Sequence, residues 1–185
     1  MSILASPSTL DKVTDFEEGQ FDQVIDLFRG SVPATIIDLP HAWTGWVRRT
    51  LVDADDVAIT ATPDLASLRN AKNLIDTLKQ ARPNDTPPKL VLNMASMPKR
   101  PEIEAKDFAD ALSMEPAVIV PFDAEVFGNA ANSGHMIAEV SARHDAVASF
   151  DHLAHRLSGR KTDSAKKKGG LTPIVKKLLQ GRKAS

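Results

Sequence analysis

Residues 34–40 of this chain read Ala-Thr-Ile-Ile-Asp-Leu-Pro. The run is apolar and β-branched but too short for a helix, so it predicts a strand buried on both faces, as in a parallel sheet. Pro40 cannot donate to a sheet ladder and is expected to end the strand. Asp38 then lies at the carboxyl end, where open α/β sheets bind ligands. Two interpretations of Asp38 remain open: an acid that holds Mg²⁺ through water in a nucleotide site, or a cap of the next helix.

Further apolar runs alternate with helical patterns along the chain. Strands are predicted at 57–61, 90–93 and 117–120, with a strand fragment at 3–5. Apolar residues recur at helical spacing in between, at 21–28, 43–51, 64–82, 105–112 and 147–157. Strands that alternate with helices in this way indicate βαβ units. We therefore predict an α/β fold whose mostly parallel, doubly wound sheet has about five strands and helices on both faces.

The strongest helical pattern follows Asp64 and stops before Pro83. Its apolar residues recur every three or four positions, which is the spacing of one helix face. The predicted buried side consists of Leu65, Leu68, Leu74, Ile75 and Leu78.

Composition limits the kind of protein that this chain can be. With 185 residues, of which 42% are hydrophobic, it is long enough to bury the core of one ordinary domain. The absence of cysteine excludes a disulfide framework and a thiol nucleophile. No apolar run approaches the roughly 20 residues of a membrane span. The first residues lack the basic and then apolar pattern of a secretion signal, so we expect a cytoplasmic protein.

Charge is divided unevenly along the chain. Residues 156–185 hold ten Lys or Arg and one acid, a net charge of +9. Residues 1–155 hold 13 basic and 23 acidic residues, a net charge of −10. A basic tail after an acidic globule indicates a separate module. We therefore divide the chain into an α/β domain at 1–159 and a basic linker with a short amphipathic tail helix at 160–185.

The tail combines apolar spacing with positive charge. Its apolar residues recur at i, i+3, i+4, i+7 and i+8, which gives one face of a helix: Leu171, Ile174, Val175, Leu178 and Leu179. Basic residues precede or flank this face: Lys166, Lys167, Lys168, Lys176 and Lys177. Such a segment is typical of helices that lie on an anionic membrane or dock into a partner's groove. A solvated, disordered tail is the alternative.

The sequence contains no phosphate-binding loop. Such a loop needs closely spaced glycines after a strand, followed by Lys and Ser or Thr. Lys168-Gly169-Gly170 begins in that way, but Leu171-Thr172-Pro173 follows and no strand precedes it, so we interpret it as a hinge. His152 and His155 are three residues apart on a predicted helix, but no acid-rich metal motif accompanies them. We interpret them as solvated helix residues.

Two polar positions follow later strands. Asn93 ends the third main strand, and its amide carries a donor and an acceptor suited to the edge of a base. A turn residue is the alternative for Asn93, because asparagine tolerates unusual backbone angles. Asp123 and Glu125 follow the fourth strand and fit a helix cap and first turn.

Several motifs together resemble one protein family. They are Ile36-Ile37-Asp38-Leu39-Pro40-His41-Ala42-Trp43-Thr44, the stretch from Ala61 to Lys72 (ATPDLASLRNAK), Leu90-Val91-Leu92-Asn93, Val120-Pro121-Phe122-Asp123, and Phe127 to Gly134 (FGNAANSG). In order and spacing they resemble the MinD/ParA group of deviant P-loop ATPases. Within that group the resemblance is strongest to the CpaE/TadZ proteins of Flp/Tad-type pilus assembly, and it covers most of residues 2–160.

The resemblance implies roles for four residues. Asp38 matches the acid that binds the Mg²⁺ water near the γ-phosphate, and Asn93 matches the residue that hydrogen-bonds adenine. Pro121 and Asp123 match the loop beside the base. ATP and Mg²⁺ are thus the cofactors implied, although we expect this chain to bind neither alone, because the phosphate loop is absent. We expect an incomplete MinD/ParA-like fold, and a chain that is the C-terminal portion of a CpaE-like protein, either a truncated product or a separately encoded half.

Three functions remain open at this point. The first is a non-catalytic positioning or scaffold component of pilus biogenesis, at the inner face of the membrane or the cell pole. Its partners would be pilus-assembly proteins, a full-length homologue or a second copy. The second is an ATPase subunit whose phosphate loop comes from another chain. The third is DNA association through the tail lysines, marked by salt-sensitive binding, and it is the least favoured.

Overall fold

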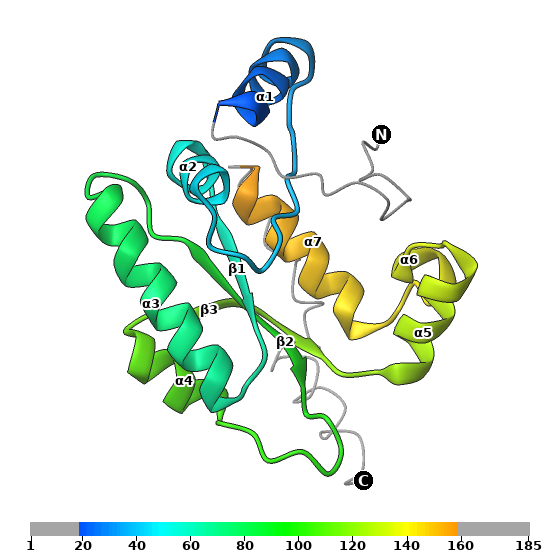
Figure 1. Ribbon diagram of the computed structural model, residues 1–185. Coiled ribbons are helices and arrows are strands. Elements are labelled where there is room, and N and C mark those ends of the chain that lie inside the picture. The colour runs from blue at the N-terminus through cyan, green and yellow to red at the C-terminus, as the bar shows by residue number, and fades with distance from the viewer. Residues whose placement is uncertain (1–18, 159–185) are drawn as a thin grey trace, which may run out of the picture. The chain divides into compact units, whose positions relative to one another are not determined.

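The computed structural model describes residues 19–158 (Figure 1). From α2 onward the strands alternate with helices, as the sequence predicts. The elements are α1 (Gln20–Ser31), α2 (Gly45–Asp53), β1 (Ala58–Ala61), α3 (Leu65–Ala81), β2 (Lys89–Ala95), α4 (Ala105–Leu112), β3 (Pro116–Pro121), α5 (Ala124–Ser133), α6 (Ile137–Val140) and α7 (Asp145–Leu157). The chain divides into two compact units, Met1–Ile59 with Ala66–Lys89, and Thr60–Leu65 with Leu90–Ser185. The predicted strand at 3–5 and the predicted tail helix lie outside the described residues.

In the first unit, α1 and α2 are joined by a ring contact, an ion pair and a hydrogen bond. The Phe21 and Trp46 rings are 5.1 Å apart between centroids, and Arg49 Nε lies 2.9 Å from an Asp22 carboxylate oxygen. Arg29 donates to the carbonyl of Asp53 at 2.7 Å. Helix α2 buries Val47 and Thr50, whereas α1 buries none of its residues.

Helix α3 confirms the predicted helix but changes its buried side. Ile75 and Leu78 are buried together with Ala71, whereas Leu65 is 73% exposed, so the prediction for Leu65 was wrong. Leu65 is the first helical residue, and at about 100° per residue it points roughly 140° away from Leu78. Leu65 therefore fits the apolar spacing in the sequence but lies away from the buried face that contains Ile75 and Leu78.

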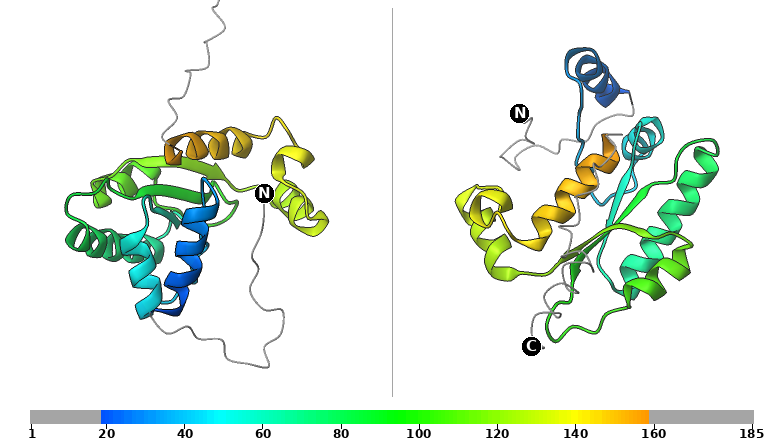
Figure 2. Two further views of the ribbon diagram at one scale, coloured as in Figure 1. Left: turned by 90° about the horizontal axis from the view of Figure 1, so that it is seen from above. Right: turned by 180° about the vertical axis from the view of Figure 1, so that it is seen from behind.

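The second unit is built on two parallel strands. Val91 pairs with Val118, Leu92 with Ile119, and Ala95 with Pro121. Helix α7 lies along β3 (Figure 2), and its buried Ala146 packs with valines of both strands. Partly buried Phe127 and Leu153 complete this cluster, which comprises Val91, Val118, Val120 and Ala146. Leu90 and Leu92 are buried too, and α4 adds Phe108, Ala109 and Leu112 to the core.

The sheet has three strands in the order β1-β2-β3, not the five expected. Strands 57–61, 90–93 and 117–120 are confirmed, but residues 34–39 form no strand, and Ile36 is 95% exposed. A β-branched run sets a local preference for extended backbone, whereas a strand also needs a neighbour to pair its N–H and C=O groups. No described segment pairs with residues 34–39, so the run stays outside the sheet.

Candidate functional site

Asn93, Pro121 and Asp123 lie near the carboxyl ends of the neighbouring strands β2 and β3, and we call them the carboxyl-edge site. The pairing of Ala95 with Pro121 is extended by a hydrogen bond of 2.8 Å from the Phe122 N–H to the Ala95 carbonyl. The two strand ends are therefore held side by side. The resemblance matches Asn93 to the adenine-binding residue and matches Pro121 and Asp123 to the loop beside the base. The structure places all three near the ends of two paired strands.

The Asn93 amide retains the groups that a base edge requires. Its Oδ1 accepts the N–H of Met94 at 2.9 Å, and the side chain is half-buried. An amide oxygen has a second lone pair, and no described group accepts a hydrogen bond from Asn93 Nδ2. One acceptor site and the Nδ2 donors therefore remain for a ligand, a combination that matches the N6 and N7 groups of adenine.

The loop after Asn93 holds an unusual backbone in place. Met94, Ser96 and Lys99 have positive φ angles of 58°, 62° and 62°, a conformation that costs non-glycine residues about 1–2 kcal/mol each. Arg100 Nη2 donates to the Met94 carbonyl at 3.1 Å. The Glu102 carboxylate accepts the N–H groups of Ser96 and Met97, each at 2.9 Å. These bonds offset the cost of the backbone conformation beside Asn93.

Arg100 and Glu102 also pair with each other, at 3.3 Å. The pKa of Glu102 is lowered, first by the Ser96 and Met97 N–H donors and then by the Arg100 guanidinium. Arg100 Nε is buried and has no hydrogen-bond partner among the described residues. This pair was not predicted from the sequence. The prolines at 98 and 101 mark the loop in the sequence, but no local pattern shows which backbone groups its charges will meet.

Asp123 connects two helices at the end of β3. Its Oδ1 accepts the Val126 N–H at 2.9 Å, which confirms the predicted cap of α5. Its Oδ2 lies 3.3 Å from His144 Nε2, while His144 Nδ1 accepts the Ala146 N–H at 3.2 Å and so caps α7. Because Nδ1 accepts, the proton of a neutral His144 is assigned to Nε2, which points at the carboxylate. The pKa of Asp123 is lowered, chiefly by the Val126 N–H and secondarily by His144.

Asp38 belongs to the first unit, in the irregular segment before α2. Its side chain is exposed, and no described residue forms an ion pair with it. It does not cap α2, whose N-cap residue is Thr44, and the Thr44 hydroxyl is buried without a partner in the part of the chain that the structure describes. The carboxylate is therefore open to solvent and, as a hard oxygen ligand, suits Mg²⁺.

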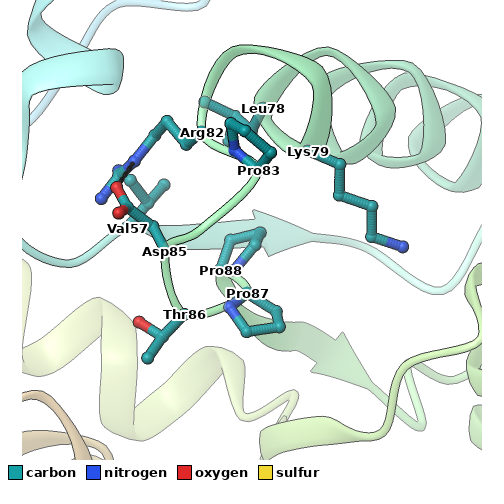
Figure 3. Close-up of a pocket in the computed structure, with 9 residues that line it drawn as sticks. All are labelled: Val57, Leu78, Lys79, Arg82, Pro83, Asp85, Thr86, Pro87 and Pro88. Carbon is teal, nitrogen blue, oxygen red and sulfur yellow. Dashed lines mark hydrogen bonds and ion pairs between the residues drawn. The ribbon is translucent and has the colours of Figure 1, made fainter.

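A pocket of about 240 Å³ lies elsewhere in the first unit, at the end of α3 (Figure 3). Three prolines line it, and Arg82 is already held by Asp85 at 2.7 Å and by the Leu51 carbonyl at 3.0 Å. Figure 3 shows Lys79 extending away from these groups. The residues that line this pocket near β2 come just before that strand, at its amino end, and none of them is a predicted site residue. We therefore do not propose it as a nucleotide site.

The predicted tail site, from Lys166 to Leu179, lies outside the described residues. Within residues 19–158, no cluster of three or more His, Asp or Glu side chains is arranged to hold a metal ion. None of the helices α1 to α7 combines the length and the apolar character needed to cross a membrane.

Comparison with known proteins supports the resemblance at the level of the MinD/ParA group. The septum site-determining protein MinD of Bacillus subtilis (strain 168) is 26% identical over 160 residues, which cover 85% of this chain and 58% of that protein. No family model matches the chain. The sequence similarity indicates homology to MinD/ParA-type P-loop ATPases.

Solved structures show the same fold. A ParA family ATPase from Chlorobium tepidum TLS matches with a TM-score of 0.65 and 20% identity, over 82% of this chain and 61% of that chain. MinD from Pyrococcus horikoshii OT3, complexed with Mg-ADP, matches with a TM-score of 0.65 and 16% identity, over 76% and 56%. A chain of the MinC:MinD cell division protein complex of Aquifex aeolicus matches with a TM-score of 0.64 and 20% identity, over 78% of this chain and 60% of that chain.

These matches confirm the α/β fold of the MinD/ParA type. The chain spans only 56–61% of the length of these relatives. Binding of the same ligands by this chain is therefore a proposal.

Proposed function

We propose that this chain is a positioning or scaffold component of Flp/Tad pilus biogenesis, of the CpaE/TadZ type, without ATPase activity of its own. The observation that carries the proposal is the contrast between two halves of a nucleotide site. The carboxyl-edge site retains Asn93 with ligand groups available, whereas the 185 residues contain no phosphate-binding loop. The motifs around Asp38 and at 120–134 support the pilus type within the MinD/ParA group.

The free energies of the available contacts favour a chain that does not bind ATP without a partner. Two hydrogen bonds from the Asn93 amide to a base contribute about 1–3 kcal/mol in total, at roughly 0.5–1.5 kcal/mol each. A dissociation constant of 1 mM already needs about 4.1 kcal/mol. In related folds the phosphate contacts come from backbone N–H groups at a helix N-terminus, and this sequence has no loop to supply them. Base contacts alone therefore leave binding weaker than millimolar.

Binding of a fluorescent ATP analogue with Mg²⁺ tests the missing phosphate site. The wild-type chain and the Asp38→Ala and Asn93→Ala variants should all show no saturable binding up to millimolar analogue. Micromolar binding by the wild type that is lost in Asp38→Ala would contradict a scaffold without nucleotide, because it would require a phosphate site within these residues.

The pilus role is tested in the bacterium that encodes the chain. Deleting the gene should reduce surface pili, and a fluorescent fusion should concentrate at a pole or at envelope foci. The Asn93→Ala and Asp38→Ala genes should restore pili to the wild-type count if the chain acts as a scaffold. Normal piliation in the deletion strain would refute the pilus role and leave the ATP result intact.

A second candidate is an ATPase subunit whose phosphate loop is supplied by another polypeptide. Among the described strands β1 has a neighbour on one side only, and an open edge of this kind accepts a strand from another chain. The hydrogen-bonding groups that remain available on Asn93 favour this candidate. Mixing the chain with a partner that carries a phosphate loop should then produce ATP hydrolysis, and Asn93→Ala should reduce it. Hydrolysis by the partner that is unchanged by this chain would exclude the candidate.

A further inference from the structure

The loop between β2 and α4, residues 96–104, encloses the carboxylate of its own Glu102. Figure 1 shows that this β2–α4 loop projects beyond the end of β2 before the chain returns to α4. Glu102 Oε2 accepts the N–H of Ser96, and Oε1 accepts the N–H of Met97, each at 2.9 Å. Arg100 Nη2 lies 3.3 Å from Oε1. Two successive backbone N–H groups that converge on one anion beside a guanidinium form an arrangement that binds carboxylates and phosphates.

The β2–α4 loop favours a charged acceptor over a neutral one. The pKa of Glu102 is lowered, chiefly by the Ser96 and Met97 N–H donors, so the loop stabilises the ionised carboxylate. The loop also has donors that Glu102 does not use. Arg100 Nε is buried without a hydrogen-bond partner in the part of the chain that the structure describes, and the exposed Lys99 adds a second positive charge. The loop therefore has donors and charge enough for an anion with more oxygens than a carboxylate, such as a phosphate group.

We propose that the β2–α4 loop is an anion-binding site, which the Glu102 carboxylate occupies until an external carboxylate or phosphate group replaces it. The incoming group would accept the N–H groups of Ser96 and Met97 and pair with Arg100, as Glu102 does in the structure. This site is separate from the pilus and nucleotide roles proposed above, because it uses none of the side chains of the carboxyl-edge site.

Glu102 closes the site without sealing it from water. The side chains of Glu102 and Arg100 are 21% and 25% exposed, so an ion in solution can reach them. Glu102 follows Met97 by only five residues, and a tether this short gives an effective concentration of about millimolar or higher. An ion as small as formate binds no more tightly than roughly 1 mM, because the number of its atoms limits its affinity. The tethered carboxylate therefore excludes small ions from the wild-type site, and a ligand that displaces it needs additional contacts.

Replacement of Glu102 would affect the backbone beside Asn93 through Arg100. Arg100 Nη2 also donates to the Met94 carbonyl at 3.1 Å, and the Met94 N–H donates to Asn93 Oδ1 at 2.9 Å. If Arg100 turns toward an incoming anion, the Met94 carbonyl loses this donor. Anion binding at the β2–α4 loop is therefore coupled to the positive-φ backbone that follows Asn93.

Removal of the internal carboxylate tests the proposal. Glu102→Ala empties the site, whereas the matched control Glu104→Ala removes a neighbouring exposed acid whose side chain makes no cap bond. Sodium formate and sodium phosphate are titrated separately into the full, nitrogen-15-labelled chain at constant ionic strength. In Glu102→Ala the amide signals of Ser96 and Met97 should shift saturably, at anion concentrations about tenfold below any response of the wild type or of Glu104→Ala. Saturation by formate alone would identify a carboxylate ligand, and a lower midpoint for phosphate would identify a phosphate ligand.

Two further variants separate anion binding from loss of the loop. Glu102→Gln removes the charge but keeps the side-chain shape and one oxygen acceptor, so it provides the same titration if Glu102→Ala does not fold, and its midpoint should lie below that of the wild type. Adding Arg100→Gln to either variant should abolish the saturable shifts, because no guanidinium remains to pair with the anion. The same anions should raise the Tm of Glu102→Ala more than that of the wild type, since they bind only the folded state. Shifts that do not saturate, that are equal in Glu102→Ala and Glu104→Ala, or that survive Arg100→Gln would overturn the proposal.

Discussion

Two leucines of α3 give a direct test of which side of that helix is buried. Leu65 and Leu78 both belong to the apolar spacing of the sequence, but Leu65 is 73% exposed and Leu78 only 3%. Replacing each by Ala makes the same chemical change on the same helix. The comparison therefore isolates burial from side-chain type.

The expected losses differ several-fold. Leu→Ala at a buried position costs about 2–5 kcal/mol, from lost transfer energy and the cavity that remains, and we expect about 3 kcal/mol for Leu78→Ala. Full burial of a leucine contributes about 1.5–3 kcal/mol, and only a quarter of Leu65 is covered, which gives about 0.5 kcal/mol. The higher helix propensity of Ala offsets part of that small loss.

Thermal unfolding and urea unfolding, each followed by circular dichroism, measure both changes. For a chain of this length about 1 kcal/mol shifts Tm by roughly 2–4 °C, so Leu78→Ala should lower Tm by about 6–12 °C and Leu65→Ala by about 1–2 °C. The slope of free energy against urea should not change, because the surface exposed on unfolding is similar. Equal losses in the two variants would refute the orientation of α3 described above.

Three other positions give sharp expectations. Ser113 ends α4 with a φ of 50°, so Ser113→Gly should raise the free energy of unfolding by about 0.5–1 kcal/mol, whereas Ser113→Ala should not; urea midpoints decide. The lowered pKa of Asp123 stabilises the fold above its ordinary pKa of about 4, and this contribution is lost as the pH falls through the folded-state value. Asp123→Asn should therefore weaken the pH dependence of stability below about pH 4, and an unchanged profile from pH 2 to 6 would contradict the cap. Glu102→Gln should speed hydrogen exchange at the Ser96 and Met97 amides, while Glu104→Gln, whose side chain makes no cap bond, should leave both rates unchanged.

The sequence predicted that Asn93, Pro121 and Asp123 follow buried strands, but it did not predict that Asp38 lies outside any strand or which residues bond to the loops beside the strand ends. Asn93 and Asp123 follow buried strands, and the carboxyl ends of parallel strands meet at one edge, so spacing alone brings them together. His144 is different, because it lies 21 residues beyond Asp123 and reaches it only through the path of α5 and α6. Arg100 and Glu102 bond mainly to backbone groups of a loop whose positive φ angles no sequence pattern predicts.

The sequence by itself determined the order and type of the elements in residues 45–121 and of the helix at 145–157. The spacing of apolar residues and the length of the run identify a helix or strand from its own segment. The helix predicted at 105–112, for example, has the same bounds in the structure. Tertiary structure decided what each segment lies against. Residues 34–39 have the composition of a strand but no partner in the described sheet, and Leu65 has the spacing of a core residue but points to solvent. Pairing and burial depend on residues distant in the chain, and local preference carries no information about those neighbours.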